Sequence, residues 1–293
     1  MIKPIVAALF VAASLATAAN AAIVTTPSGI LNGTPSPGAS DTFAFDTWLR
    51  QNVRTGASTG ITNTFPYGGD GSAWLTSADG TGKADWSYFR SGGFGRLSDV
   101  VGASYVWYRA SSSTNPAIQM PAFRIVVDID GDLVTTPTDI AYLVYEQAYN
   151  EAGGWTAPTD AWQASSIVGS TYLWVSQPGV GNEEVFNRTL ADYQAGTYTP
   201  TPGWSQITGN SVVLGIMMGI GSGWAGAFTG AVDNATLVMG GAAPLTFASN
   251  FEVTAPAPRA PAAPVPVDAP LPLAAAAAAL ALLGWRKLRR APR

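Results

Sequence analysis

Residues 123–130 read Phe-Arg-Ile-Val-Val-Asp-Ile-Asp, and this stretch decides the fold class of the chain. Each odd-numbered position is a large apolar residue, whereas the even-numbered positions include Arg124 and Asp128. Successive side chains of a β-strand point to opposite faces, so the alternation gives one apolar face and one face that carries charge. A helical period does not fit. The stretch is therefore predicted to be a strand that buries one face in a core.

Five more segments show the same short apolar runs, with Gly-, Asp- and Asn-containing turns between them. They are residues 104–109, 140–146, 170–175, 212–220 and 232–239. No fixed-period repeat indicates a propeller or a solenoid. The sequence therefore predicts an all-β domain over residues 22–254, a two-sheet antiparallel jelly-roll β-sandwich, with helical turns only near 147–151 and 190–194.

The segment around residue 230 resembles the closing hairpin of carbohydrate-binding jelly rolls. In such domains a G-x-V-D-N-x-x-L run begins the last strand, and here it is matched by Gly230, Val232, Asp233, Asn234 and Leu237. The resemblance implies a carbohydrate-binding type of fold. The Asp and Asn side chains are expected to satisfy backbone groups where the strand enters the sheet.

Residues 1–21 have the pattern of a secretory signal peptide. Lys3 is followed by an apolar run over residues 5–15 and by Ala19-Asn20-Ala21, an A-x-A cleavage pattern. The run is shorter than the roughly 20 residues that span a bilayer. We therefore expect export through the inner membrane with cleavage after Ala21.

Two segments follow the predicted sandwich. Residues 255–270 are rich in Pro and Ala and are expected to form a stiff linker. Residues 271–293 combine an uncharged Ala/Leu run, a good helix former, with a closing basic cluster over 286–293. Basic residues stay on the cytoplasmic side of a membrane, so this tail is predicted to be an apolar transmembrane helix.

The tail also resembles a known sorting signal. The residues Pro270-Leu271-Pro272-Leu273-Ala274, the apolar run and the terminal Arg cluster are similar to the PEP-CTERM group in its VPLPA-CTERM variant. The resemblance implies recognition by a sorting protease and delivery to the cell surface or extracellular matrix. If the tail is not cleaved, it would tether the domain to the inner membrane.

Composition excludes several kinds of chemistry. The chain has neither cysteine nor histidine. Thiol chemistry, Ser-His-Asp and Cys-His catalysis and the usual zinc sites are therefore excluded. Residues 22–254 contain eight basic and eighteen acidic residues, so this part of the chain carries a net charge near −10. An acidic surface argues against nucleic acid as a partner.

Asp128, Asp130 and Asp132 place three carboxylates within five residues. Ca²⁺ takes six to eight oxygen ligands, and a D-x-D-x-D spacing supplies several of them. The sequence does not complete an EF-hand loop, because its twelfth position is Asp139 and not Glu. A calcium site and a strand that simply ends in an Asp-Gly turn both remain open.

Glu146 and Glu151 are the candidate catalytic pair, since glycosidases use two carboxylates set either about 5 or about 7–9 Å apart. The sequence around them carries no catalytic motif. Solvated carboxylates without a catalytic role are the alternative interpretation.

Trp155, Trp204 and Trp224 each follow a glycine in a loop and are the candidate ligand-binding residues. Aromatic rings pack against sugar faces, but they also fill cores, so both roles remain open for these three. Trp107 and Trp174 lie in predicted strands and are expected in the core.

Three functions fit these observations. The first is an exported, surface-anchored, non-catalytic protein that binds an extracellular polysaccharide or belongs to the extracellular matrix. The second is a secreted glycoside hydrolase or lyase that uses acidic residues, because carboxylate catalysis needs no histidine. The third is a purely structural protein of the envelope.

Overall fold

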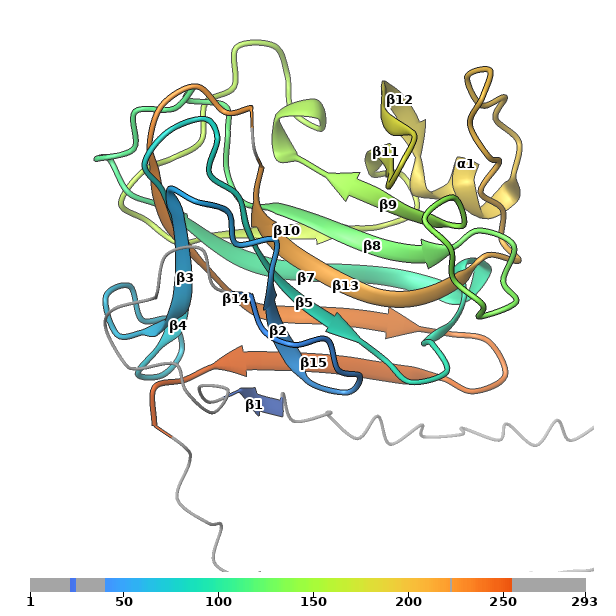
Figure 1. Ribbon diagram of the computed structural model, residues 1–293, viewed down its shortest axis with the longest axis horizontal. Helices are drawn as coiled ribbons and strands as arrows, with labels where there is room; N and C mark the ends of the chain where they lie inside the picture. Colours follow the sequence, from blue (N-terminus) through green and yellow to red (C-terminus); the bar gives the residue numbers. More distant parts are fainter. Residues whose placement is uncertain (1–21, 25–39, 222, 255–293) are drawn as a thin grey trace, which may run out of the picture. The chain divides into compact units, whose positions relative to one another are not determined.

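The computed structural model describes residues 22–24, 40–221 and 223–254, which form two packed β-sheets (Figure 1). The predicted signal peptide, linker and sorting tail lie outside these residues. One sheet has seven strands. They are β1 (Ala22–Val24), β3 (Ala57–Thr62), β4 (Ser72–Ser77), β7 (Val100–Arg109), β10 (Gln163–Ile167), β14 (Phe228–Met239) and β15 (Leu245–Phe251).

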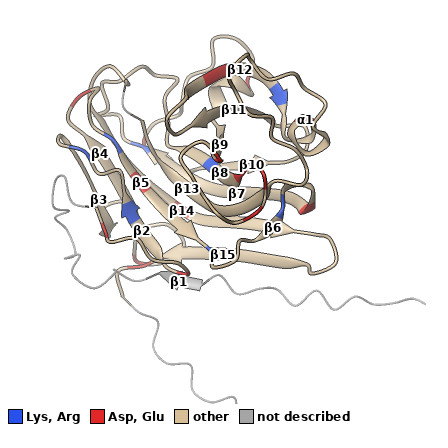
Figure 2. Ribbon diagram, turned by 45° about the vertical axis from the view of Figure 1, so that its right-hand side comes forward, with Lys and Arg blue, Asp and Glu red and all other residues tan. Residues whose placement is uncertain are grey.

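The other sheet has eight strands and follows the order β12-β11-β9-β8-β13-β5-β2, with β6 also paired to β13. Figure 2 shows this sheet curving from β2 to β12. Its strands are β2 (Trp48–Gln51), β5 (Ala84–Phe89), β6 (Gly95–Arg96), β8 (Ala122–Asp128), β9 (Ile140–Tyr145), β11 (Tyr172–Gln177), β12 (Gly181–Thr189) and β13 (Val212–Ile220).

This architecture confirms the predicted all-β jelly-roll sandwich. Strand pairing is antiparallel throughout both sheets except between β1 and β15, which run parallel. Among the residues that the structure describes, helical structure is limited to three short elements, η1 (Leu97–Asp99), η2 (Gln147–Tyr149) and α1 (Leu190–Ala195). The last two occupy the predicted helical turns. No helix among the described residues is long and apolar enough to cross a membrane.

Aromatic side chains join the two sheets in the core. The ring of Tyr105 on β7 lies 5.3 Å from that of Phe123 on β8, and the ring of Phe251 on β15 lies 5.3 Å from that of Trp86 on β5. The indole of Trp86 donates a hydrogen bond of 2.6 Å to the Thr59 hydroxyl on β3. Burying each large apolar side chain stabilises the fold by about 1.5–3 kcal/mol. This packing fixes which face of each strand points inward.

The G-x-V-D-N run lies inside β14, and the expectation that it begins the last strand is wrong. The chain turns after Met239 and returns as β15, which pairs with β14. Within β14 the pairing register shifts after Asp233, and Asn234 adopts a positive φ of 46°. The Asp233 carboxylate accepts hydrogen bonds from the backbone N–H groups of Asn234 and Phe251. The Asp233 side chain thus satisfies backbone groups, as predicted, but it does so in the middle of β14 and not where the strand enters the sheet.

Candidate functional site

A groove of about 500 Å³ lies on the face of the eight-stranded sheet that points away from the core. Its floor is a row of side chains that crosses β13, β8, β9 and β11. In order, the row is Met217, Arg124, Val144 and Trp174. Neighbouring strands are about 4.8 Å apart, so the row extends over about 14 Å. A second row lies two residues further along β9 and β11 on the same face, where Tyr142 pairs with Ser176.

A buried carboxylate fixes the arginine of the groove floor. Asp85 on β5 has no exposed surface and accepts hydrogen bonds of 2.7 Å from Arg124 and from the side-chain amide of Asn52. The ammonium of Lys83 lies 3.7 Å from the same carboxylate. Burial lowers the pKa of Lys83, and the charge of Asp85 opposes that shift. The guanidinium of Arg124 is therefore held in one position, and its charge is compensated by the buried carboxylate of Asp85.

Aromatic rings form one wall of the groove. The ring of Tyr149, in η2, stacks on that of Phe186, on β12, with 3.8 Å between centroids and 12° between planes. The ring of Trp174 meets Phe186 edge-on at 6.5 Å. Tyr149 remains 37% exposed, so this wall presents a large ring to solvent.

Two glutamates line the groove, Glu146 and Glu184. Burial raises the pKa of Glu146, the charge of Arg124 opposes that rise, and the charge of Glu184 adds to it. The Trp174 indole N–H is itself buried and has no hydrogen-bond acceptor within range. The groove thus combines acceptors, donors and aromatic faces.

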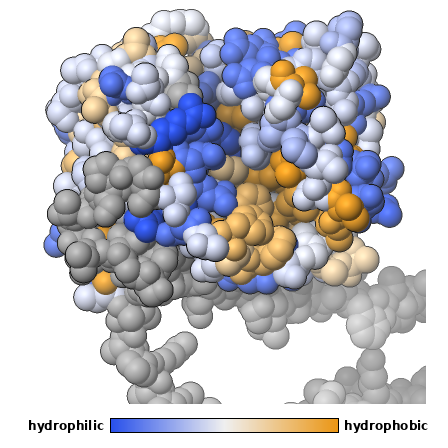
Figure 3. All heavy atoms as spheres, viewed as in Figure 1, coloured by the Kyte–Doolittle hydropathy of each residue, from blue (hydrophilic) through white to orange (hydrophobic). Residues whose placement is uncertain are grey.

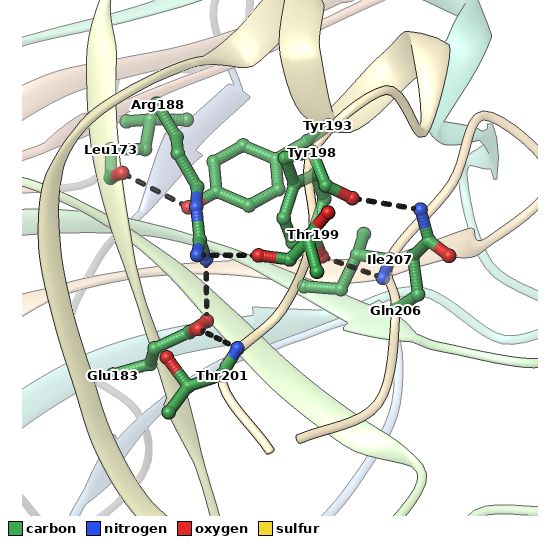
Figure 4. A network of polar contacts seen from close by, with 9 residues as sticks. All are labelled: Leu173, Glu183, Arg188, Tyr193, Tyr198, Thr199, Thr201, Gln206 and Ile207. Atoms are coloured by element: carbon green, nitrogen blue, oxygen red, sulfur yellow. Dashed lines mark hydrogen bonds and ion pairs between the residues drawn. The ribbon is translucent and has the colours of Figure 1, made fainter. Parts of the chain in front are cut away.

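A polar network holds the edge strand that carries part of this wall (Figure 4). The Glu183 carboxylate accepts hydrogen bonds from Arg188 at 2.7 Å and from the backbone N–H of Thr201 at 2.6 Å. Arg188 also donates to the Thr199 carbonyl and lies 4.6 Å from the centre of the Tyr198 ring. Since Glu183 points inward, strand alternation turns its neighbours Asn182 and Glu184 toward the groove. These contacts tie β12 to the loop after α1.

The structure separates the two carboxylates named from sequence as a catalytic pair. Glu146 lines the groove. Glu151 is exposed, accepts a hydrogen bond of 2.9 Å from Gln147 and lines a different hollow beside β10. The second carboxylate of the groove is Glu184, in β12.

The three loop tryptophans also separate. Trp224 lines the groove at the end opposite the aromatic wall, and it is 8% exposed. Trp155 and Trp204 pack against the core and do not line the groove. Trp107 is fully buried, as expected. The expectation that Trp174 lies in the core is wrong, because it points to the opposite face of β11 from its buried neighbours Leu173 and Val175.

The carboxylates of Asp128, Asp130 and Asp132 lie together at the end of β8, with one oxygen of each within 4.8 Å of the others. Burial raises the pKa of Asp128, and the charges of Asp130 and Asp132 contribute to the rise. The structure is compatible with both interpretations of the sequence, a strand that ends in an Asp-Gly turn and a calcium site. Strand β8 ends at Asp128, and the three carboxylates converge.

Sequence reasoning did not select Arg124, Tyr142, Tyr149, Trp174 and Phe186, which line the groove. A signal for two of them was present. Arg124 is a charged residue within an apolar strand, and Tyr142 shares a face of the predicted strand over 140–146 with Glu146. No local signal places Phe186 beside Tyr149, because that contact depends on how β12 and η2 are brought together.

A separate apolar patch lies outside the groove. Phe43 and Phe45, which precede β2, are 53% and 54% exposed. The ring of Phe43 lies 5.4 Å from that of Phe89 at the end of β5. Figure 3 shows apolar residues gathered over this part of β2 and β5, with hydrophilic residues around them. The groove shares none of these three aromatic residues.

No known protein family matches the sequence, and no curated protein does. Among solved structures, the chain is similar to a family 11 carbohydrate-binding module from Clostridium thermocellum in complex with a β-1,3-1,4-mixed-linked tetrasaccharide. The identity is 15% and the TM-score 0.37, covering 67% of this chain and 91% of that one. A carbohydrate esterase of the Shiga toxin-encoding bacteriophage phi24B gives 12% identity and a TM-score of 0.33, covering 66% and 90%. TM-scores this low establish neither a family nor a ligand for this chain.

Proposed function

We propose that the protein binds a polysaccharide in the groove of the eight-stranded sheet. One observation carries the proposal: a single open face brings together aromatic rings and hydrogen-bonding side chains. Trp174 and Tyr149 offer rings for the apolar faces of sugars, while Arg124, Glu146 and Asn182 offer partners for hydroxyl groups. The shape suits a chain molecule, because the floor row crosses four strands.

The charges of the groove favour a neutral glycan over an ionised one. Arg124 forms an ion pair with Asp85, and Lys83 lies beside the same carboxylate. Glu146 in turn lies within the electrostatic reach of Arg124. Since these charges compensate one another, binding should change little between low and physiological salt, whereas capture of an anionic polymer would weaken as salt rises.

The test is titration of the purified protein with neutral and anionic soluble polysaccharides, followed by Trp174→Ala on the one that binds. Loss of the ring is expected to weaken binding by about tenfold or more. Trp162→Ala is the matched control, since Trp162 is also half-buried but packs beside Tyr67 and Tyr108, outside the groove. Binding that falls equally in both variants, or no binding to any glycan, would refute the assignment.

A second candidate is a glycoside hydrolase or lyase that uses Glu146. The observation that favours it is the raised pKa of Glu146 beside Glu184, because a general acid must hold its proton until the leaving group departs. Release of new reducing ends from a bound glycan would support this candidate. Glu146→Gln should then abolish release while leaving affinity within a few-fold, whereas a pure binding module releases none in either form.

We also propose that the protein is exported and held at the cell surface, a proposal that rests on residues 1–21 and 255–293 of the sequence. Mass spectrometry of protein released from intact cells tests it. A mature chain that starts at Ala22 and ends before Leu271 supports export and sorting. An intact Arg293 on membrane-bound protein indicates a tether instead.

A further inference from the structure

The turn that leaves β8 is organised by three aspartates. Each accepts a backbone hydrogen bond: Asp128 from Leu133 at 2.7 Å, Asp130 from Asp132 at 3.3 Å, and Asp132 from Val134 at 2.7 Å. Leu133 adopts a positive φ of 65°, which lets the chain fold back over Asp128. The result is a compact loop whose carboxylates converge on one point.

One oxygen in this loop has no partner. Asp128 has no exposed surface, and while its Oδ2 accepts the hydrogen bond from Leu133, its Oδ1 is buried with no donor. A buried carboxylate oxygen without a partner is costly, and proteins satisfy such atoms with a donor, a water or a cation. The ion pairs formed elsewhere in the described chain use the carboxylates of Asp41, Asp85 and Glu183, not those of this loop.

The three carboxylates lie close enough together to share a single hard cation. Oxygens bound to the same Ca²⁺ lie 2.3–2.6 Å from it, so two of them can be at most about 5 Å apart. One oxygen from each aspartate lies within 4.8 Å of the others. Mg²⁺ usually keeps several waters and is bound through only one or two carboxylates, so three converging carboxylates favour Ca²⁺. An all-oxygen set also disfavours zinc and copper, which prefer nitrogen and sulfur.

We propose that Asp128, Asp130 and Asp132 bind a Ca²⁺ ion. The ion would use the free Oδ1 of Asp128 and an oxygen from each of the two exposed aspartates. Water and backbone carbonyls would complete its shell, because Asp130 and Asp132 face solvent. Its effect would be to hold the loop over residues 129–139 against the end of β8. This site is separate from the glycan groove, and the proposal does not depend on glycan binding.

The experiment is calorimetric titration of the chelator-treated full-length protein with CaCl₂, together with thermal unfolding. One Ca²⁺ should bind per chain, and saturation should raise the unfolding midpoint by about 5 °C. Asp130→Asn with Asp132→Asn should weaken binding by about tenfold or more. These two side chains are exposed, so the double variant should fold even if Asp128→Asn does not.

Asp139→Asn is the matched control. Asp139 belongs to the same loop, and Asp139→Asn removes one negative charge where the double variant removes two. Its carboxylate accepts a hydrogen bond from the N–H of Thr136 and lies outside the cluster. The affinity of the Asp139→Asn variant for Ca²⁺ should stay within about threefold of that of the unmodified protein, because the charge that is lost lies outside the cluster and is screened by solvent. The proposal is overturned if Ca²⁺ gives neither heat nor a midpoint shift, if the double variant binds normally, or if Asp139→Asn loses as much affinity per charge removed as the double variant does.

Discussion

Replacing Arg188 with Met should expose how strongly the groove wall depends on one buried ion pair. The side chains of Arg188 and Glu183 are only 12% and 3% exposed, and their charged atoms lie 2.7 Å apart. Removing one partner of a buried pair costs about 3–5 kcal/mol, because the remaining charge loses its compensation. The contact of Arg188 with the Tyr198 ring adds about 0.5–1 kcal/mol. Arg188→Met should therefore lower the free energy of unfolding by about 3.5–6 kcal/mol.

The pH dependence of this loss provides a second check. Burial raises the pKa of Glu183, but hydrogen bonds from Arg188 and Thr201 outweigh it, so the pKa is lowered from 4.5. A lowered pKa contributes stability above the unfolded value, and that contribution disappears as the pH falls through the folded value. Without Arg188 the carboxyl takes up a proton more readily. The deficit of the variant should thus be largest near neutrality and shrink below pH 4.5.

Urea unfolding followed by tryptophan fluorescence measures both effects. Arg96→Met is the matched control, since Arg96 is exposed on β6 and its loss should cost under about 0.5 kcal/mol. A double-mutant cycle with Glu183→Gln isolates the pair from the contact with Tyr198. A loss below about 1 kcal/mol, or one that is the same at neutral and acidic pH, would contradict a buried, charge-compensated pair.

Two further predictions concern residues within the strands β13 and β14. Gly219→Ala would place a Cβ 2.1 Å from the Asp85 carboxylate, so it should lower the free energy of unfolding by about 1–3 kcal/mol. Gly153→Ala is the control in the same thermal melts: its Cβ would meet nothing within 4 Å, so stability should not change. Burial raises the pKa of Asp233 from 3.8 to about 8. The native state then holds a proton that the unfolded state loses, so stability should fall as pH rises between those values. Asp233→Asn should remove that slope in urea midpoints taken across the range, and an unchanged slope would place the titrating group elsewhere.

Six of the strands, β7, β8, β9, β11, β13 and β14, were predictable because their residues are locally consistent. The alternation in β8 and the apolar run of β13 specify strands without any knowledge of their partners, and both appear where expected. Strand β12 is one of those that were not predicted. Its sequence, Gly-Asn-Glu-Glu-Val-Phe-Asn-Arg-Thr, is mostly polar and resembles a loop. It becomes a strand because it pairs with β11 and because Glu183 and Arg188 satisfy each other beneath it.

The candidate site was harder to predict because its residues meet through pairing between distant segments. Arg124 and Trp174 lie 50 positions apart in sequence and come together only through the register of β8, β9 and β11. Glycine-flanked loop tryptophans were a natural first choice, but Trp155 and Trp204 have enough apolar surface nearby to pack against the core. Of the three, only Trp224 lies in a loop that reaches the groove.

Strand alternation in β9 shows what the sequence leaves undecided about the groove. Ala141, Leu143 and Tyr145 face the core, while Tyr142 and Val144 face the groove. Both sets are apolar enough to be buried, so the period of two identifies a strand without saying which face is inside. That choice is made by the other sheet, which covers one face only. The same residues that a second layer would have buried therefore line an open surface, and their aromatic rings are left available to a ligand.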